Sequence, residues 1–302
     1  MRKGFAIALV TMLLVFGYAA LNPARSHQVD TSSHAHLQQQ ESQAQDQSQQ
    51  MAELHQGDRP ISSPLLVGME DLAVTTEAVT YGGTEEQPLT GYLAQPAESS
   101  PDQPGLIVIQ EWWGLNDNIK AMTRRLASEG YTALAVDLYD GEVADTPDVA
   151  RALVQKALET PEQLEQNVVA AYDYLANTLN TPTVGSIGWC FGGTWSLNTA
   201  LALPNDLDAA VIYYGGGMTT ERDRLETLQM PIQGHFGLLD TRPSPETGAE
   251  FEAVLDDLGK TAEIYVYGGA GHAFANPSGT RYNADAAELS WDRTLTFLND
   301  HL

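Results

Sequence analysis

The sequence predicts an α/β fold in which a mostly parallel sheet carries helices on both faces, preceded by a β-hairpin. Six short runs are mostly apolar, which is typical of strands buried on both faces of a sheet. Gly82-Gly83 lies between two earlier strand-like segments, 74–79 and 90–93, and predicts the hairpin turn that joins them. The predicted central strands cover 105–109, 132–136, 183–188, 209–214, 231–236 and 262–266.

Helical patterns separate several of these strands. They cover 119–129, 194–203 and one long stretch over 147–180. Strands that alternate with helices in this way indicate a parallel sheet, because a parallel connection needs a crossover long enough to hold a helix.

Three regions follow one another along the chain. A basic start and an apolar run over 5–21 predict an export signal at 1–26, or an uncleaved membrane anchor, and therefore a periplasmic or extracellular location. Residues 27–63 are rich in Gln, Ser and His and predict a disordered tether. The folded domain is expected over 64–302. Four histidines of the tether are expected in solvent rather than in a metal site: His27, His34, His36 and His55.

Composition narrows the possible functions. The 302-residue chain has a formal net charge of -25 and a pI near 4.3, which argues against nucleic acid as a partner. Its single cysteine excludes an internal disulfide and a zinc site built from several thiolates. No metal or organic cofactor is expected, and the sequence says nothing of the oligomeric state.

That single cysteine lies in the strongest motif, Gly-Trp-Cys-Phe-Gly-Gly at 188–193, between a buried strand and a helical stretch. This is the G-x-nucleophile-x-G elbow of an α/β-hydrolase, with Cys190 in the place of serine. Flanking glycines are needed because Cβ atoms there would collide with the strand or the helix. The adjacent helix N-terminus lowers the pKa of a thiol. Cys190 is therefore the candidate nucleophile.

A base and an acid complete the predicted triad. Outside the tether, His301 is the penultimate residue and His235 lies in a buried strand, whereas His272 lies in a glycine-rich loop after a strand. His272 is therefore the candidate base. In an α/β-hydrolase the acid falls between nucleophile and base, after a strand. Asp240 meets this condition and would orient the imidazole of His272, whereas Asp256 and Asp257 fall in a helical pattern.

The loop after the strand 105–109 carries a further candidate, Glu111, within Gln-Glu-Trp-Trp-Gly at 110–114. The corresponding loop of an α/β-hydrolase supplies one N–H of the oxyanion hole, so the backbone amides of Phe191 and Trp112 are the expected donors. Glu111 either reaches the thiol or is a loop glutamate that points to solvent.

These motifs together resemble the dienelactone hydrolase family. The resemblance rests on 110–116, Asp-Leu-Tyr at 137–139, the elbow, His-Phe-Gly at 235–237, Asp240 and Gly-His-Ala-Phe at 271–274, and covers about Leu89 to Leu302. It implies a Cys-His-Asp triad, and a glutamate at the position of Glu111 that contacts the resting thiol and helps to generate the thiolate.

The sequence departs from the family at two positions. Members that cleave dienelactone resemble one another in two arginines that hold the substrate carboxylate, and these positions are Gly141 and Asn276 here. Dienelactone is therefore a doubtful substrate, although three other arginines could take over this role: Arg151, Arg242 and Arg281.

The expected function is hydrolysis of a small-molecule carboxylic ester or lactone through a thioester at Cys190. A pocket lined by four aromatic residues is expected, although core packing explains these residues equally well: Trp113, Tyr139, Trp189 and Phe274. Two alternatives keep the same fold. One is a tethered ligand-binding module without activity, which an unreactive thiol would favour, and the other is an acyltransferase, which products formed with added alcohols or amines would reveal.

Overall fold

The computed structural model describes residues 31–58, 60, 72–98 and 100–302, and the side chains of residues 31–41 are not among what it describes. The predicted export signal at 1–26 lies outside the described residues. None of the described helices combines the length and the apolar character that a bilayer-crossing segment needs.

The centre of the fold is an eight-stranded sheet with the order β1-β2-β4-β3-β5-β6-β7-β8. The first two strands form an antiparallel hairpin that pairs with β4, and the pairs from β4 to β8 are parallel. The predicted hairpin and mostly parallel sheet are therefore confirmed. The strands are β1 (Val74–Gly83), β2 (Pro88–Pro96), β3 (Gly105–Ile109), β4 (Thr132–Val136), β5 (Val184–Trp189), β6 (Ala209–Tyr213), β7 (Ile232–Gly237) and β8 (Ala262–Tyr267).

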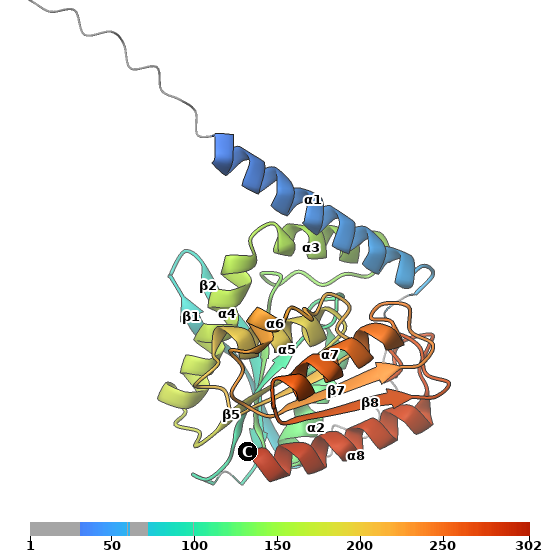
Figure 1. Ribbon diagram of the computed structural model, residues 1–302. Coiled ribbons are helices and arrows are strands. Elements are labelled where there is room, and N and C mark those ends of the chain that lie inside the picture. The colour runs from blue at the N-terminus through green and yellow to red at the C-terminus, as the bar shows by residue number, and fades with distance from the viewer. Residues whose placement is uncertain (1–30, 59, 61–71, 99) are drawn as a thin grey trace, which may run out of the picture.

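Helices cover both faces of the sheet (Figure 1). On β3, Leu106 and Val108 pack with α2 (Asp117–Ser128) and α8 (Ala284–His301). Ile107 and Ile109 face the opposite way, toward the remaining large helices. The alternation arises because successive side chains of a strand point to opposite faces. The opposite layer contains α3 (Pro147–Leu158), α4 (Pro161–Asp173), α5 (Phe191–Ala202) and α7 (Pro245–Asp257), and α6 (Arg222–Leu225) is a short helix next to α7.

The prediction of a single helical stretch over 147–180 is wrong. The structure divides it into α3, α4 and a π-helical turn at Tyr174–Thr178. The break falls at Pro161, the first residue of α4. Proline has no N–H to donate to the preceding turn and disfavours a helical conformation in the residue before it, so it starts a new helix more readily than it continues one.

The region predicted as a disordered tether contains a helix, α1 (Thr31–Leu54), which lies across α3 (Figure 1). Its buried positions are Ala44 and Ser48, with Met51 partly buried and His55 buried just after its end. These positions are spaced by three or four residues and therefore share one face of a helix. Glutamine and alanine are also good helix formers. Low aliphatic content concealed this face, because two of its four members are Ser and His.

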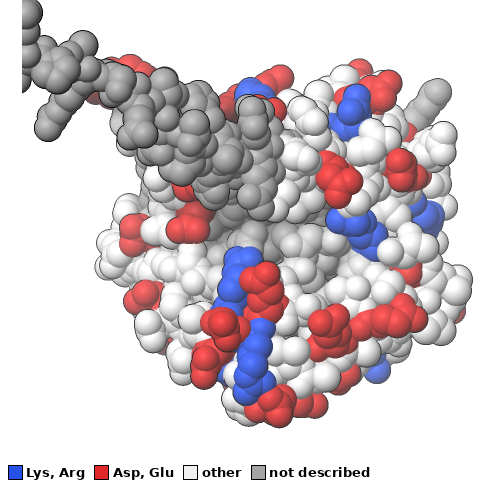
Figure 2. Space-filling view, turned by 45° about the horizontal axis from the view of Figure 1, so that its top comes forward, with Lys and Arg blue, Asp and Glu red and all other residues white. Residues whose placement is uncertain are grey.

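The surface agrees with the charge expected from composition. On the face shown in Figure 2, acidic side chains are scattered among uncharged atoms, and the few basic side chains lie beside acidic ones. This face offers no continuous basic area of the kind that binds a phosphate backbone.

Candidate active site

Cys190 lies at the turn between β5 and α5 and is only 1% exposed. Its backbone has a positive φ of 57°, a conformation that non-glycine residues seldom adopt outside functional turns. A Cβ on Gly188 would lie 2.0 Å from the carbonyl oxygen of Gly192, and a Cβ on Gly192 would lie 2.3 Å from that of Ile109. Only glycine allows these approaches, so the two glycines permit the tight turn that presents the sulfur at the N-terminus of α5.

The structure brings the three residues of the predicted triad together. His272 Nε2 lies 3.2 Å from Cys190 Sγ, and His272 Nδ1 lies 2.9 Å from Asp240 Oδ2. The other carboxylate oxygen of Asp240 accepts a hydrogen bond from the backbone N–H of Arg242 at 2.8 Å. Both oxygens of Asp240 are therefore engaged, and one of them fixes the orientation of the imidazole.

The electrostatics of this arrangement favour a thiolate and an imidazolium. Burial alone raises the pKa of the Cys190 thiol, but the adjacent imidazoles of His272 and His55 together outweigh burial and lower this pKa to about 6. Burial alone lowers the pKa of His272, but the Cys190 sulfur and the Asp240 carboxylate raise it above its ordinary value. Each partner stabilises the charged form of the other, which is how a thiol becomes a nucleophile near neutral pH.

His235, which the sequence places in a buried strand, lies in the core as expected. It is fully buried in β7, and its ring nitrogens lie 2.8 Å from the Tyr267 hydroxyl and from Gln233 Oε1. Burial lowers the pKa of His235 to about 3, so the ring is neutral and occupied by structural hydrogen bonds. It is not available as the base for Cys190.

Glu111 is buried, at 2% exposure, so the interpretation as a solvent-facing loop glutamate is wrong. Its Oε2 accepts a hydrogen bond from Asn276 Nδ2. Burial, reinforced by the nearby Cys190, raises the pKa of Glu111 to about 8, so the carboxyl group is mostly neutral at pH 7. Asn276, which occupies one of the family's arginine positions, therefore contacts this glutamate.

We expect Glu111→Gln to preserve the fold and to lower kcat/KM for esters by about 10²-fold, the lower end of the usual effect of a proton-transfer group. Glutamine keeps an oxygen for the Asn276 N–H but can neither release nor take up a proton. Because the pKa of Glu111 is raised in the folded state, wild-type stability should fall as pH rises from about 4.5 through about 8. The variant should lack this decrease.

Thermal unfolding midpoints and ester turnover, measured for both proteins across this pH range, check these two expectations separately. Unchanged turnover in a stable variant would exclude Glu111 from the activation of the thiol.

The loop that carries Glu111 lies against the elbow. A Cβ on Gly192 would meet the carbonyl oxygens of both Ile109 and Gln110, so the start of α5 packs directly on the end of β3. Among the described residues, neither the Phe191 N–H nor the Trp112 N–H has a hydrogen-bond acceptor. Two backbone donors that no described residue occupies, on adjoining segments at the nucleophile, are what an oxyanion hole requires.

A cavity of about 830 Å³ opens beside Cys190 and His272, between the elbow and α1. Phe191 and Trp195 provide aromatic surface in it, and Met51 and Leu54 line it from α1. The four aromatic residues predicted to line the pocket do not line this cavity, because all four are buried in the core packing on either side of the sheet: Trp113, Tyr139, Trp189 and Phe274.

The three arginines that could hold a substrate carboxylate lie in different places. Arg242 lines the cavity, together with Arg224, which the sequence did not single out, and with three acidic residues of α4 and α6: Glu162, Glu165 and Asp223. Arg281 instead binds the carbonyl oxygen of Leu54 at the end of α1, and Asp58 in the segment after it. Arg151 does not line the cavity.

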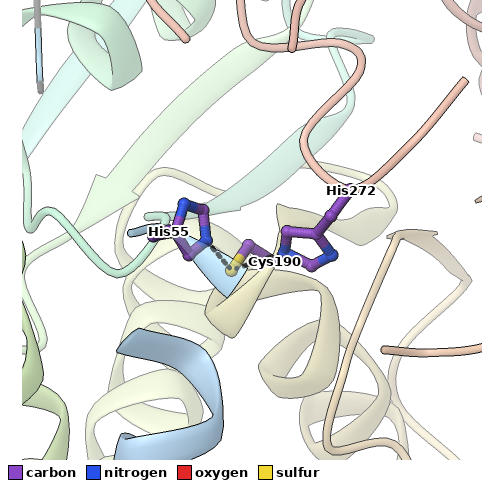
Figure 3. A group of neighbouring side chains, drawn as sticks. All are labelled: His55, Cys190 and His272. Carbon is purple, nitrogen blue, oxygen red and sulfur yellow. Dashed lines mark hydrogen bonds between the residues drawn. The ribbon is translucent and has the colours of Figure 1, made fainter. Parts of the chain in front are cut away.

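His55 is the site residue that sequence reasoning missed. It is 2% exposed, and its Nε2 lies 3.7 Å from Cys190 Sγ (Figure 3). Its ring stacks on Trp112, with the ring centres 4.3 Å apart. His55 Nδ1 lies 2.8 Å from Asp58 Oδ2. The expectation that this histidine is solvated is therefore wrong. The spacing of Ala44, Ser48 and His55 on one helical face was the available signal.

Comparisons with known proteins agree with this geometry. Residues 89–302 match the dienelactone hydrolase family. Protein usf of Aquifex pyrophilus is 33% identical, with 70% of this chain and 93% of that protein covered. A Saccharolobus solfataricus protein that carries the name carboxymethylenebutenolidase is 31% identical, with coverages of 66% and 91%.

Solved structures give the same result. A dienelactone hydrolase-like promiscuous phosphotriesterase from metagenomic libraries superimposes with a TM-score of 0.68 at 25% identity, covering 76% of this chain and 99% of that one. A structure from Klebsiella pneumoniae, titled as a dienelactone hydrolase, has a TM-score of 0.64 at 28% identity, with coverages of 74% and 98%. The chain therefore belongs to the dienelactone hydrolase family.

Proposed function

We propose that the protein hydrolyses a small carboxylic ester or lactone through a thioester at Cys190. The observation that carries this proposal is the alignment of Cys190 Sγ, the His272 imidazole and the Asp240 carboxylate, at 3.2 and 2.9 Å, beside a cavity. Membership of a hydrolase family supports the same reaction class. The geometry alone does not require a metal or organic cofactor for this step.

In the first half of the reaction the Cys190 thiolate attacks the carbonyl carbon, while His272 carries the proton that the thiol gave up. The oxyanion that forms lies between the N–H groups of Phe191 and Trp112. One such donor is worth about 3–4 kcal/mol of transition-state stabilisation. The tetrahedral adduct then collapses, the C–O bond breaks, and His272 protonates the leaving alkoxide. The acyl group stays on the sulfur.

In the second half His272 takes a proton from water, and the resulting hydroxide attacks the thioester carbonyl. The same two N–H groups stabilise the second oxyanion. Collapse expels the Cys190 thiolate and releases the carboxylic acid. A lactone differs only in that its leaving hydroxyl group remains part of the acyl chain.

The cavity favours an acyl group with an apolar part. Phe191, Trp195 and Met51 supply apolar surface, while the charged lining residues include two arginines and three acids. This mixed lining does not reproduce a dedicated carboxylate clamp, in agreement with Gly141 and Asn276 at the family's arginine positions. We therefore propose that the substrate does not need a free carboxylate.

We also propose that the protein is exported. The support is the basic start and the apolar run over 5–21, and any membrane attachment would use only this N-terminal segment.

A burst experiment tests the proposal. Rapid mixing of the enzyme with a short p-nitrophenyl ester should release about one equivalent of p-nitrophenol in a fast phase, followed by slower steady turnover, because an activated ester acylates the thiol faster than the thioester is hydrolysed. Acid quenching and peptide mapping should place the acyl mass on Cys190. Turnover without any acyl group on Cys190, even under conditions that slow hydrolysis, would contradict the thioester mechanism.

A further inference from the structure

Two histidines face the nucleophile from different sides (Figure 3). His272 reaches Cys190 from the loop after β8, and His55 reaches it from the turn after α1. The proposed hydrolysis uses only His272. His55 is nevertheless buried, stacked on Trp112 and hydrogen-bonded, so its position needs an explanation beyond packing.

We propose that Cys190, His55 and His272 form a binding site for a divalent metal ion of the zinc class. The three donor atoms, one sulfur and two nitrogens, all lie within 4.8 Å of one another, and all three residues are buried. A thiolate and two imidazoles suit zinc, whereas magnesium and calcium prefer oxygen ligands. The single cysteine excluded zinc sites with several thiolates, but this site needs only one.

The distances from the sulfur agree with tetrahedral coordination. With a Zn–S bond of about 2.3 Å and Zn–N bonds of about 2.0–2.1 Å, the sulfur and each nitrogen of a tetrahedral site lie about 3.6 Å apart. The observed separations from Cys190 Sγ are 3.2 Å to His272 Nε2 and 3.7 Å to His55 Nε2. Both sulfur–nitrogen separations are therefore close to the tetrahedral value. The two histidine nitrogens lie within 4.8 Å of each other, compared with about 3.3 Å in a tetrahedral site, so an ion would draw the two imidazoles together.

Each histidine also has the partner that metal-binding histidines usually have. His272 Nδ1 lies 2.9 Å from Asp240 Oδ2, and His55 Nδ1 lies 2.8 Å from Asp58 Oδ2. A carboxylate that accepts the Nδ1–H leaves Nε2 with its lone pair directed at the metal. Two carboxylate–histidine pairs that meet at one sulfur are more than a single catalytic triad requires.

The contacts of Arg281 indicate which tautomer His55 adopts. Its Nη2 lies 2.9 Å from His55 Nδ1 but only 2.6 Å from Asp58 Oδ2. The shorter contact joins two opposite charges and is the stronger one. The guanidinium therefore pairs with the carboxylate, which accepts the His55 Nδ1–H, and Nε2 is left free for a ligand.

Zinc in this site would occupy the sulfur lone pair and the His272 Nε2 that the proposed hydrolysis needs. Binding would release the proton that Cys190 and His272 share and would join the segment after α1 to the elbow. The metal-loaded protein would then be inactive as a thiol hydrolase. This consequence rests on the proposed function, but the binding itself does not.

The test uses the full chain after treatment with a chelator and removal of the chelator. Zn²⁺ is titrated against a competing indicator, with Mg²⁺ as the control ion. The wild-type protein should bind one Zn²⁺ per chain in competition with the indicator. Co²⁺ in its place should give the intense visible bands of a tetrahedral site and a thiolate-to-cobalt band. Zn²⁺, but not Mg²⁺, should slow alkylation of Cys190 by iodoacetamide about tenfold or more.

Variants assign the ligands. His55→Gln should weaken Zn²⁺ binding at least about tenfold and abolish the protection of Cys190. Asp58→Asn, which leaves His55 in place but replaces the carboxylate that His55 shares with Arg281, should weaken binding by about 10- to 100-fold. His301→Gln, on α8 and away from the elbow, is the matched control and should bind Zn²⁺ like the wild type.

If Zn²⁺ leaves the alkylation rate unchanged, or if both His55→Gln and Asp58→Asn keep wild-type affinity, the proposed site is wrong. In that case His55 serves only as a hydrogen-bond partner of the sulfur. Ester turnover by the chelator-treated wild type is measured separately. It tests the proposed hydrolysis whatever the metal titration gives.

Discussion

Replacing Cys190 with alanine is expected to reduce kcat for short p-nitrophenyl esters by at least about 10³-fold. Alanine removes the only group at the elbow that can form the acyl intermediate. The oxyanion-hole amides and the cavity remain, and in other hydrolases such residues alone leave a weak catalysis that is far below that of the intact triad. The measurement is steady-state turnover with enough variant enzyme to detect the residual rate above buffer.

Cys190→Ser is the companion variant. Serine retains the shape and a hydroxyl, but the environment of Cys190 favours a charged pair with His272, and a hydroxyl does not ionise in that way. We expect the serine variant to be strongly impaired as well. Cys190 has a positive φ, so a substitution there can also disturb the turn. Thermal unfolding of both variants is therefore the control. Wild-type turnover by a folded alanine variant would show that the nucleophile lies elsewhere.

The nucleophile could be predicted from sequence because its requirements are local. The elbow needs glycines two residues on either side of Cys190, and the close approaches at Gly188 and Gly192 are the physical reason for this spacing. His272 could be predicted because few histidines remained once His235 and His301 were assigned to a strand and to the chain end. Such elimination works when the chain contains few residues of the type that the chemistry needs.

The environment of the Glu111 carboxyl group could not be predicted from local sequence. The position of Glu111 after β3 follows from the sequence, but the hydrogen bond to its buried carboxyl group comes from Asn276, which is 165 residues away. The contact replaces a family arginine with an amide that holds a carboxyl group, and no local pattern reveals such a pairing.

His55 was missed for a related reason. Composition described its surroundings as a tether, yet a helix forms when one face has a partner, and that partner is α3 in the folded domain. The prediction of an aromatic pocket has the opposite error, because it places in the site residues that belong to the core. Trp189 lies next to the nucleophile in sequence, but its side chain belongs to a β-strand and alternation turns it into the core.

Asp240→Asn is expected to lower kcat by about 10³- to 10⁴-fold with little change in folding. The asparagine oxygen can still accept the Arg242 N–H, but its amide group then faces His272 Nδ1. An N–H in that position favours the tautomer with the proton on Nε2, which points at Cys190 Sγ and leaves no base for the thiol. The corresponding change in a serine protease costs about 10⁴-fold.

Asp256→Asn is the matched control for this variant, because Asp256 is an exposed aspartate on α7. It should keep near wild-type turnover and stability, as surface substitutions usually do. Stability of both variants is measured by thermal unfolding and turnover with the same p-nitrophenyl ester. If folded Asp240→Asn loses no more activity than the control, the carboxylate does not orient His272 during catalysis. The base would then depend on the buried Cys190–His272 pair alone, since the thiolate itself already raises the pKa of the imidazole.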